Sequence, residues 1–391
     1  MTITFPDGFV WGTATAAHQV EGGNWNNDWW AWEHAPNTVC PEPSGDAVDH
    51  YSRYPSDLSV LAALGFGSYR FSIEWSRIEP EEGEFSRSAL DHYRRMLATC
   101  LEQGLLPVVT FHHFTTPRWA TTGDTWADPI TAERFARFCE RAVDALGDLI
   151  GMANTLNEPN VVALIGYMIG VFPPARQDAG LYVRASEVLI DAHRRAYDVL
   201  KGGRGDFPVG LTLSMGDWYA EPGGEEALAG IRRQHEDIYL EAARGDDFFG
   251  VQAYSRTRLD ARGMPIGPEA GVDVLDMGYE YWPQALDVAI RHAADVTGVP
   301  LYVTENGIGT TDDDQRIRFV TSALEGVARC IDDGIDVRGY FYWSAMDNFE
   351  WAYGYKPKFG LIAVDRETQL RTLKPSAQWL GHIARTNRLE S

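Results

Sequence analysis

Short runs of apolar, β-branched and aromatic residues alternate with longer amphipathic segments along the whole chain. Runs of this length and composition predict buried β-strands. We find them at Phe9–Ala17, Gly67–Trp75, Leu106–Phe114, Ile150–Glu158, Phe207–Met215, Asp247–Ser255, Pro300–Asn306 and Val337–Ala345. Because the segments between them have the periodicity of helices, the pattern predicts parallel βαβ units.

One intervening segment shows how these helices are recognised. Apolar side chains recur there at helical spacing, at Leu90, Tyr93, Leu97, Cys100 and Leu101. Gly104 follows the stripe and predicts the end of the helix, because glycine readily takes the left-handed conformation found just after helix C-termini.

Eight βα units close most simply into a (β/α)8 barrel, the TIM-barrel architecture. The alternative is an open doubly wound sheet, which usually carries a Gly-x-Gly-x-x-Gly loop after its first strand. The residues at that point, Gly12–Thr15, lack this pattern, and no linker or low-complexity segment interrupts the chain. We therefore predict an α/β protein with a single (β/α)8 barrel domain over residues 1–391.

The charge balance and the chain's N-terminal segment narrow the possible partners. The chain has 34 Lys and Arg against 56 Asp and Glu, a formal charge of −22 at pH 7. Nucleic acids and anionic membranes attract clustered cations, which this sequence lacks. No apolar stretch approaches the roughly 18 residues of a membrane helix, and Met1–Val10 has no signal-peptide pattern. We expect a cytoplasmic protein without nucleic-acid or membrane partners.

The cysteines are few and widely spaced. They are Cys40, Cys100, Cys139 and Cys330, with no Cys-x-x-Cys pair among them. Two disulfides are arithmetically possible, but buried free thiols are favoured in a chain of this size.

In a barrel, function resides at the C-terminal ends of the strands. Several of the apolar runs end in polar or acidic side chains, which are poor choices for a core. These positions include Gln19, Arg70, His112, His113, Asn157, Glu158, Gln252, Tyr254 and Glu305. Because the fourth and seventh strands face each other across the barrel mouth, Glu158 and Glu305 can converge on one pocket.

Two facing carboxyl groups suit the hydrolysis of a glycosidic bond. One must be protonated to assist the leaving oxygen, and the other must be ionised to attack or stabilise the anomeric carbon. Their surroundings must therefore separate their pKa values. Arg70 and Tyr254 are candidates to hold one of them as an anion. The alternative is a structural Glu–Arg pair near the top of the barrel.

Segments along the whole chain resemble the motifs of family 1 glycoside hydrolases, the retaining β-glucosidase family. Thr155–Pro159 resembles T-[FL]-N-E-P, and Thr304–Gly307 resembles T-E-N-G. The other matching segments are Phe9–Ala16 (F-x-W-G-x-A-[TS]-[AS]), Arg70–Ile78 (R-F-S-I-x-W-x-R-I), Gly339–Tyr355 (containing G-Y-F-x-W-S-x-x-D-N-F-E-W) and Lys358–Leu361 ([KR]-[FY]-G-[LI]). All of them occur in the family's order.

The resemblance implies a β-glycosidase, foremost a β-glucosidase with galactoside or fucoside cleavage also open. Glu158 is then the acid/base and Glu305 the nucleophile of a double displacement through a glycosyl-enzyme, with Arg70 and Tyr254 orienting Glu305. The residues implied in substrate binding are Gln19, His113, Asn157, Trp343, Glu350, Trp351 and Phe359. Asn157 is expected at the sugar 2-hydroxyl and Trp343 beneath the ring. The implied partner is a small-molecule β-glycoside, without cofactor or metal, for a monomer or a homo-oligomer.

The chain departs from the family pattern in three places. Phe114 follows His113 where the family usually has tryptophan, and Gln252-Ala253 replaces an Asn-Tyr pair before Tyr254. The chain is also short for the family, which suggests reduced loops around the leaving-group site.

Relatives that hydrolyse 6-phosphoglycosides are the nearest alternative. They generally carry a lysine and a tyrosine where this chain has Pro357 and Phe359. A carboxylate at Glu350, near the sugar 6-position, would repel phosphate. Unphosphorylated substrates are therefore expected.

Several other interpretations remain. A transglycosylating enzyme would use the same glycosyl-enzyme with an acceptor other than water, and a non-catalytic sugar-binding barrel would lack turnover. His112 and His113 are adjacent on a strand and point to opposite faces, which disfavours a shared metal ion. Asp312–Asp314 lacks the glycine and distal glutamate of a calcium loop and is expected to start a helix.

Overall fold

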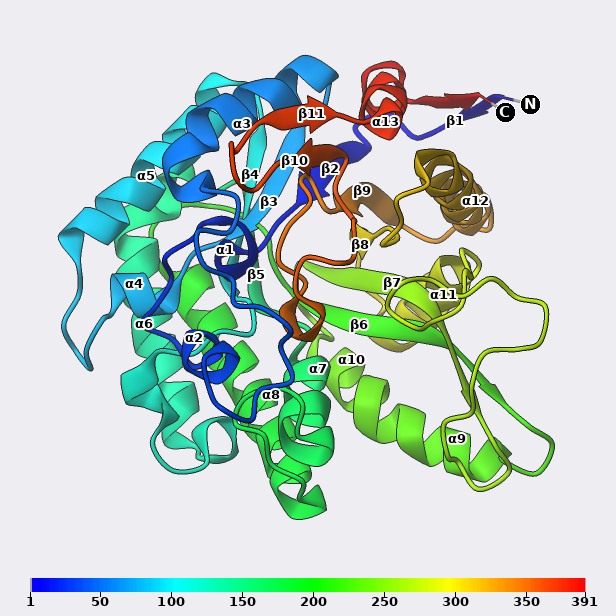
Figure 1. Cartoon of the computed structure of the whole chain (residues 1–391), viewed down its shortest axis with the longest axis horizontal. Helices are drawn as coiled ribbons and strands as arrows, with labels where there is room; N and C mark the ends of the chain where they lie inside the picture. Colours follow the sequence, from blue (N-terminus) through cyan, green and yellow to red (C-terminus); the bar gives the residue numbers. More distant parts are fainter. Residues whose placement is uncertain (1, 391) are drawn as a thin grey trace.

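The computed structural model describes residues 2–390, and eight parallel strands form its centre (Figure 1). The strands are β2 (Val10–Ala14), β3 (Ser68–Ser72), β4 (Leu106–His112), β5 (Met152–Asn157), β6 (Val209–Ala220), β7 (Phe248–Leu259), β8 (Leu301–Asn306) and β9 (Val337–Trp343). Each pairs with its neighbours in sequence, and β2 pairs with β9 to close the barrel. The predicted (β/α)8 fold and all eight predicted strands are confirmed.

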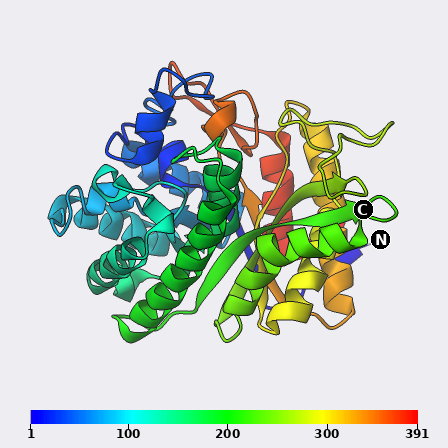
Figure 2. The ribbon, with the colours of Figure 1, turned by 90° about the horizontal axis from the view of Figure 1, so that it is seen from below.

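Two strands are longer than the sequence pattern predicts. Strands β6 and β7 have 12 residues each, and they continue as a paired ribbon beyond the predicted ends at Met215 and Ser255 (Figure 2). Trp282, in the connection after β7, also links the two strands: Arg256 of β7 stacks over its ring at 3.7 Å, and its Nε1 donates to the Asp217 carboxylate of β6 at 2.9 Å. The sequence pattern does not predict this extension, because its polar residues are typical of a loop.

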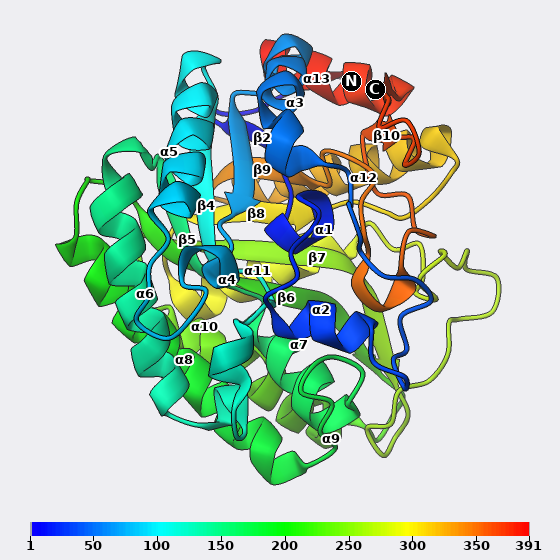
Figure 3. The same cartoon turned by 60° about the vertical axis from the view of Figure 1, so that its left-hand side comes forward.

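Helices surround the barrel and follow the strands in turn (Figure 3). The longer ones are α3 (His50–Leu64), α5 (Arg87–Glu102), α6 (Ile130–Leu146), α8 (Ala179–Gly202), α11 (Ala285–Thr297), α12 (Asp313–Asp332) and α13 (Pro375–Thr386), with α9 (Glu225–Arg232), a π-helical turn η5 (Arg233–Asp237) and α10 (Ile238–Ala242) between β6 and β7.

Short elements complete the connections. At the C-terminal ends of the strands lie α1 (Ala17–Val20), α2 (Asp28–Glu33), α4 (Trp75–Ile78), α7 (Pro159–Ala163), the π-helical η4 (Leu164–Ile169) and the 3-10 turn η6 (Trp351–Tyr353). The remaining 3-10 turns are η1 (Arg118–Thr121), η2 (Thr125–Ala127) and η3 (Gly147–Leu149). Two small antiparallel pairs join β1 (Thr2–Thr4) to β12 (Arg388–Glu390) and β10 (Ile362–Val364) to β11 (Arg371–Leu373).

The helix ends behave largely as the sequence predicts. Gly104 takes a φ of +76° just after α5, and four of the five predicted stripe residues on α5 are buried. The fifth, Leu101, is 46% exposed, because it lies at the edge of the stripe. Asp312 caps α12 by accepting a hydrogen bond from the backbone N–H of Gln315, so the acidic run does start a helix. All four cysteines are buried and free, as expected.

No helix in residues 2–390 is long and apolar enough to cross a membrane.

The barrel interior has an apolar lower part, toward the N-terminal ends of the strands, and a polar upper part, toward their C-terminal ends. A cluster of Val108, Met152, Phe248 and Phe341 fills the lower part. Large rings fit there because glycines face them. Gly12 on β2 is one of these, since a Cβ at this position would lie 2.5 Å from Cδ1 of Phe341 and 2.9 Å from the carbonyl oxygen of Ser68.

This close approach predicts the effect of a single methyl group. Gly12→Ala should lower the free energy of unfolding by about 1–3 kcal/mol, because the barrel must deform to admit the Cβ. Gly230→Ala is the matched control: Gly230 lies in α9 with no atom within 4 Å of the added Cβ, and alanine should stabilise that helix by up to about 1 kcal/mol. Urea and thermal denaturation of the three proteins measure both effects. Equal stability of Gly12→Ala and the parent would contradict this account of the barrel interior.

Candidate functional site

Glu158 and Glu305 lie at the C-terminal ends of two barrel strands and are 8% and 3% exposed. Glu305 is the second-to-last residue of β8, where a register irregularity pairs it with Gln252 of β7. Glu158 directly follows β5 and has a left-handed backbone, with φ of 44° and ψ of 57°. Non-glycine residues seldom adopt this conformation, and it is frequent at functional sites. Its N–H donates to the carbonyl oxygen of Thr212 on β6 at 3.0 Å.

Both carboxylate oxygens of Glu305 receive strong hydrogen bonds. Nη1 of Arg70 donates to Oε1 at 2.6 Å, and the hydroxyl of Tyr254 donates to Oε2 at 2.6 Å. Arg70 is fully buried and also donates to the side-chain oxygens of Asn157, at 2.6 Å, and Asn154, at 3.0 Å. The predicted neighbours Arg70, Tyr254 and Glu305 therefore do come together.

These contacts separate the acidities of the two carboxyl groups. Burial raises the pKa of Glu158 well above its usual range, and the nearby charge of Glu305 raises it further, while Arg70 and a hydrogen bond from Ser214 act in the opposite direction. Burial also raises the pKa of Glu305, but Arg70 and Tyr254 oppose that effect directly. Of the two, Glu158 is therefore the group that retains its proton to higher pH.

The hydrogen bonds around Asn157 fix the orientation of its amide. Its Oδ1 accepts from Arg70, from Nε2 of Gln252 at 2.9 Å and from the Thr212 hydroxyl at 3.3 Å. Its Nδ2 therefore faces Nε2 of His113 at 3.1 Å and donates to it. Burial and Arg70 lower the pKa of His113 well below its usual range, so the ring is neutral. With Nε2 accepting from Asn157, its proton is on Nδ1, which has no partner among residues 2–390.

A second cluster of polar side chains, apart from the one around Glu305, surrounds Glu350. Nε1 of Trp343 donates to one carboxyl oxygen of Glu350 at 3.3 Å, and Nε2 of Gln19 donates to the other at 3.3 Å. Gln19 also donates to the carbonyl oxygen of Phe349 at 2.6 Å, and its Oε1 is buried without a partner in the described part of the chain. Burial raises the pKa of Glu350 well above its usual range, and these two donors oppose the shift in part.

Aromatic rings connect the polar side chains around Glu305 with those around Glu350. The ring of His113 stacks against Trp343 at 5.7 Å and against Trp351 at 6.1 Å between centroids. Phe114 packs against Trp351 at 5.0 Å, so the phenyl ring occupies the predicted place of an indole. Phe359 meets Tyr254 edge-on at 6.0 Å. Every residue that the sequence predicts for the site therefore lies in this cluster.

The two adjacent histidines have different surroundings, in line with their opposite orientations on the strand. His112 packs edge-on against Trp126 and Phe135 outside the barrel, where burial lowers its pKa to about 3. Within residues 2–390, no group of three or more His, Cys, Asp or Glu side chains is placed to hold a metal ion.

Sequence reasoning missed several members of the cluster. Asn154 and Thr212 complete the hydrogen bonds of Arg70 and Asn157, and their alternation with apolar strand residues is the only signal that could have shown them facing inward. Met277 and Tyr279, in the connection after β7, pack against the apolar cluster that contains Trp343 and Phe359. No local pattern marks this connection as part of the site.

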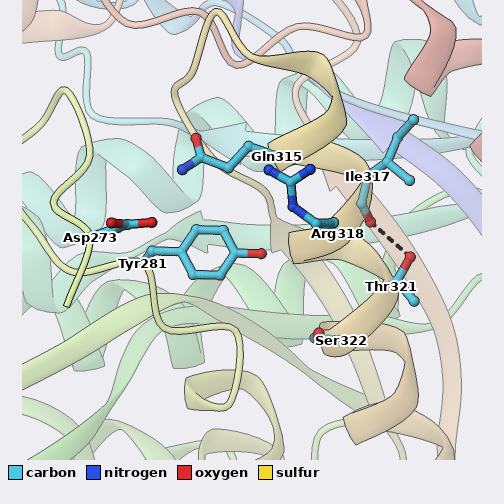
Figure 4. A pocket seen from close by; sticks show the side chains of 7 residues that line it. All are labelled: Asp273, Tyr281, Gln315, Ile317, Arg318, Thr321 and Ser322. Atoms are coloured by element: carbon cyan, nitrogen blue, oxygen red, sulfur yellow. Dashed lines mark hydrogen bonds between the residues drawn. The ribbon is translucent and has the colours of Figure 1, made fainter. Parts of the chain in front are cut away.

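A separate hollow on the outer wall lies between α12 and the connection after β7 (Figure 4). It is lined by Asp273, Tyr281, Gln315, Ile317, Arg318, Thr321 and Ser322. The Thr321 hydroxyl already donates to the carbonyl oxygen of Ile317 at 2.8 Å, and none of the predicted site residues reaches this hollow.

Comparison with known proteins identifies the family of the chain. The profile of Glycosyl hydrolase family 1 matches residues 1–242 and 260–389. Beta-glucosidase A of Thermotoga maritima is 32% identical over 99% of both chains, and the bifunctional beta-D-glucosidase/beta-D-fucosidase of Bifidobacterium breve is 32% identical over 97% of this chain and 98% of that protein. The crystal structure of beta-glycosidase BGL167 is 51% identical, with a TM-score of 0.91, over 98% of this chain and 97% of that one.

The alignment with the Thermotoga maritima enzyme runs over 442 positions, more than the 391 residues of this chain. The relative therefore contains residues that this chain lacks, as its short length suggests. With the family profile matched across the barrel and the predicted residues gathered at its mouth, the chain belongs to glycosyl hydrolase family 1 and is an O-glycoside hydrolase.

Proposed function

We propose that the protein is a retaining β-glycosidase, foremost a β-glucosidase, that hydrolyses terminal non-reducing β-D-glycosides by double displacement. The observation that carries this proposal is the pair of buried carboxyls whose surroundings differ: Glu305 is held by Arg70 and Tyr254, and the pKa of Glu158 is raised by burial. The names of its relatives as β-glucosidases support the same substrate class.

In the first step, a carboxylate oxygen of Glu305 bonds to the anomeric carbon while the bond to the leaving oxygen breaks. Glu158 transfers its proton to that oxygen, and the alcohol departs. In the second step, the Glu158 carboxylate takes a proton from water, whose oxygen displaces Glu305 from the anomeric carbon. Two inversions retain the β configuration, and both carboxyl groups return to their starting states.

The remaining residues suit recognition of a sugar ring. Gln19 Oε1 and the Nδ1–H of His113, both without partners among the residues that the structure describes, offer one acceptor and one donor to ring hydroxyls. Asn157 lies beside Arg70 and Glu305, where it can bond the 2-hydroxyl. Trp343 offers an indole face, with Glu350, Trp351 and Phe359 completing the group.

Hydrolysis of aryl β-glycosides tests the proposal directly. A panel of 4-nitrophenyl gluco-, galacto-, fuco- and xylopyranosides should show turnover, with the glucoside among the best substrates. Proton NMR during the reaction should show the β anomer of the sugar forming first. Initial release of the α anomer would contradict the retaining mechanism, and no turnover of any member would contradict the enzyme.

Removal of the nucleophile gives the first specific prediction. Glu305→Gly should abolish turnover of 4-nitrophenyl β-glucoside, because no other group can form the glycosyl-enzyme. Added azide or formate should restore activity on an activated substrate and yield the product of opposite anomeric configuration. Near-normal turnover without added anion would rule out this role for Glu305.

Removal of the proton donor, Glu158, gives the second prediction. Glu158→Ala should lower kcat/KM for alkyl glucosides by about 10²–10⁴-fold and largely spare dinitrophenyl glucoside, whose leaving group departs as an anion. The wild-type kcat/KM should fall at low pH as Glu305 is protonated, and at high pH as Glu158 loses its proton. Because the pKa of Glu158 is raised, the high-pH fall should lie above the usual carboxyl range and vanish in Glu158→Ala. An equal loss for every leaving group would refute the role of Glu158 as the acid.

The third prediction concerns phosphate. The carboxyl group of Glu350 has only neutral donors, Trp343 and Gln19, and Phe359 presents a ring nearby. Although burial favours the protonated form of Glu350, a 6-phosphate would add negative charge beside this carboxyl group, and neither of its described donors is a cation that could balance it. 4-Nitrophenyl β-glucoside should therefore have a much higher kcat/KM than its 6-phosphate, and the reverse order would overturn this view of the sugar 6-position.

A further inference from the structure

Asn160 is a fully buried amide two residues after Glu158, in the first turn of α7. Its Nδ2 donates to the carbonyl oxygen of Ser214 on β6 at 2.7 Å and lies 3.3 Å from Nε2 of His235 in η5. The side chain thus ties the start of α7 to a neighbouring strand and to the segment that packs behind it.

These bonds restrain the segment that carries Glu158. The Glu158 carbonyl oxygen accepts hydrogen bonds from the N–H groups of Val161, at 2.9 Å, and Val162, at 3.2 Å. Its own N–H donates to the carbonyl oxygen of Thr212. Glu158 is therefore held on one side by β6 and on the other by the first turn of α7. Among these contacts, the Asn160 side chain is what bonds that turn to β6.

The restraint matters because the backbone of Glu158 is in a sparsely populated conformation. A left-handed non-glycine residue costs about 1–3 kcal/mol and persists where its surroundings over-determine it. Thr212 and Ser214 lie two positions apart on β6, so their carbonyl groups hold Glu158 and Asn160 to one edge of the same strand. Loss of the second bond would allow the turn to relax and shift the Glu158 carboxyl group.

His235 keeps the Asn160 amide in one orientation. Nε2 of His235 can accept a hydrogen bond only when the ring is neutral with its hydrogen on Nδ1. Burial lowers the pKa of His235 to about 4, so the ring remains an acceptor at neutral pH. Trp218 packs edge-on against this ring at 5.7 Å. Both amide hydrogens of Asn160 therefore have acceptors in fixed places.

We propose that Asn160 is a positioning residue for proton transfer, which holds Glu158 at the leaving-group oxygen by tying α7 to β6 and to His235. The inference rests on the proposed role of Glu158 as the acid. It predicts a loss of activity that depends on the leaving group, since a displaced acid affects only substrates that need the proton.

The test compares Asn160→Leu and Asn160→Ala with the parent over a series of aryl and alkyl β-glucosides. Leucine keeps the branching of the side chain at Cγ without the donors, and alanine removes the amide without adding bulk. We expect kcat/KM for alkyl glucosides to fall by roughly 10–100-fold, because a shift of about 1 Å can cost 10²-fold, and kcat/KM for dinitrophenyl glucoside to change by less than about 3-fold. Trapping of the glycosyl-enzyme with an activated 2-deoxy-2-fluoroglucoside counts competent sites, so misfolded protein does not enter the rates.

Asn387→Ala is the matched control. Asn387 also donates from a side-chain amide to backbone carbonyl groups, those of Phe5 and Pro6 at 2.8 and 3.0 Å, but it follows α13, beside the paired chain ends. This variant should lose stability without changing the dependence of kcat/KM on leaving-group pKa.

Glu158→Ala in the same series separates the two hypotheses. If Glu158→Ala shows the leaving-group dependence and the Asn160 variants lose equally on all substrates, or lose nothing, the positioning role of Asn160 is overturned and the acid stands. If Glu158→Ala shows no leaving-group dependence, Glu158 is not the acid, and the positioning role of Asn160 is overturned together with the proposed function.

Discussion

The candidate site depends on one buried cation. Arg70 is fully buried in the barrel mouth, and its guanidinium donates to Glu305, Asn157 and Asn154 at 2.6–3.0 Å. A buried guanidinium requires an anion and a full set of acceptors, because removal of either leaves an uncompensated charge in a medium of low polarity. Glu305 supplies the anion, and the two asparagines supply the acceptors. The need to satisfy Arg70 therefore organises residues of two other strands, β5 and β8.

The same contacts give the two carboxyl groups unequal acidities. Burial alone would raise the pKa of both, and the charge of one would further raise that of the other. Arg70 and Tyr254 lie against Glu305, whereas Glu158 sits on a strained turn and has its N–H bonded to β6. An asymmetry of this kind is what an acid and a nucleophile working at one bond require, and it supports the proposed double displacement.

The barrel beneath makes this polar layer possible. Its lower interior is closed by rings such as Phe248 and Phe341, which glycines like Gly12 admit. Polar side chains of β3, β5, β6, β7 and β8 form the layer above, where they hydrogen-bond from strand to strand. The rigid strands hold these groups in place, and the short segments that follow them, such as α7, carry the more strained positions.

Local pattern in the sequence determined the eight strands, the barrel, and the polar residues at the strand ends, because burial periodicity and strand-end chemistry are encoded by neighbouring residues. The motifs around Glu158 and Glu305 also identified the family. Only the tertiary structure decided the extension of β6 and β7, the Gln252 bond to Asn157, the proton position on His113 and the tether at Asn160. The physical reason is distance along the chain: Arg70 and Glu305 are 235 residues apart, and Gln252 and Asn157 are 95 apart, so their hydrogen bonds exist only once the barrel has closed.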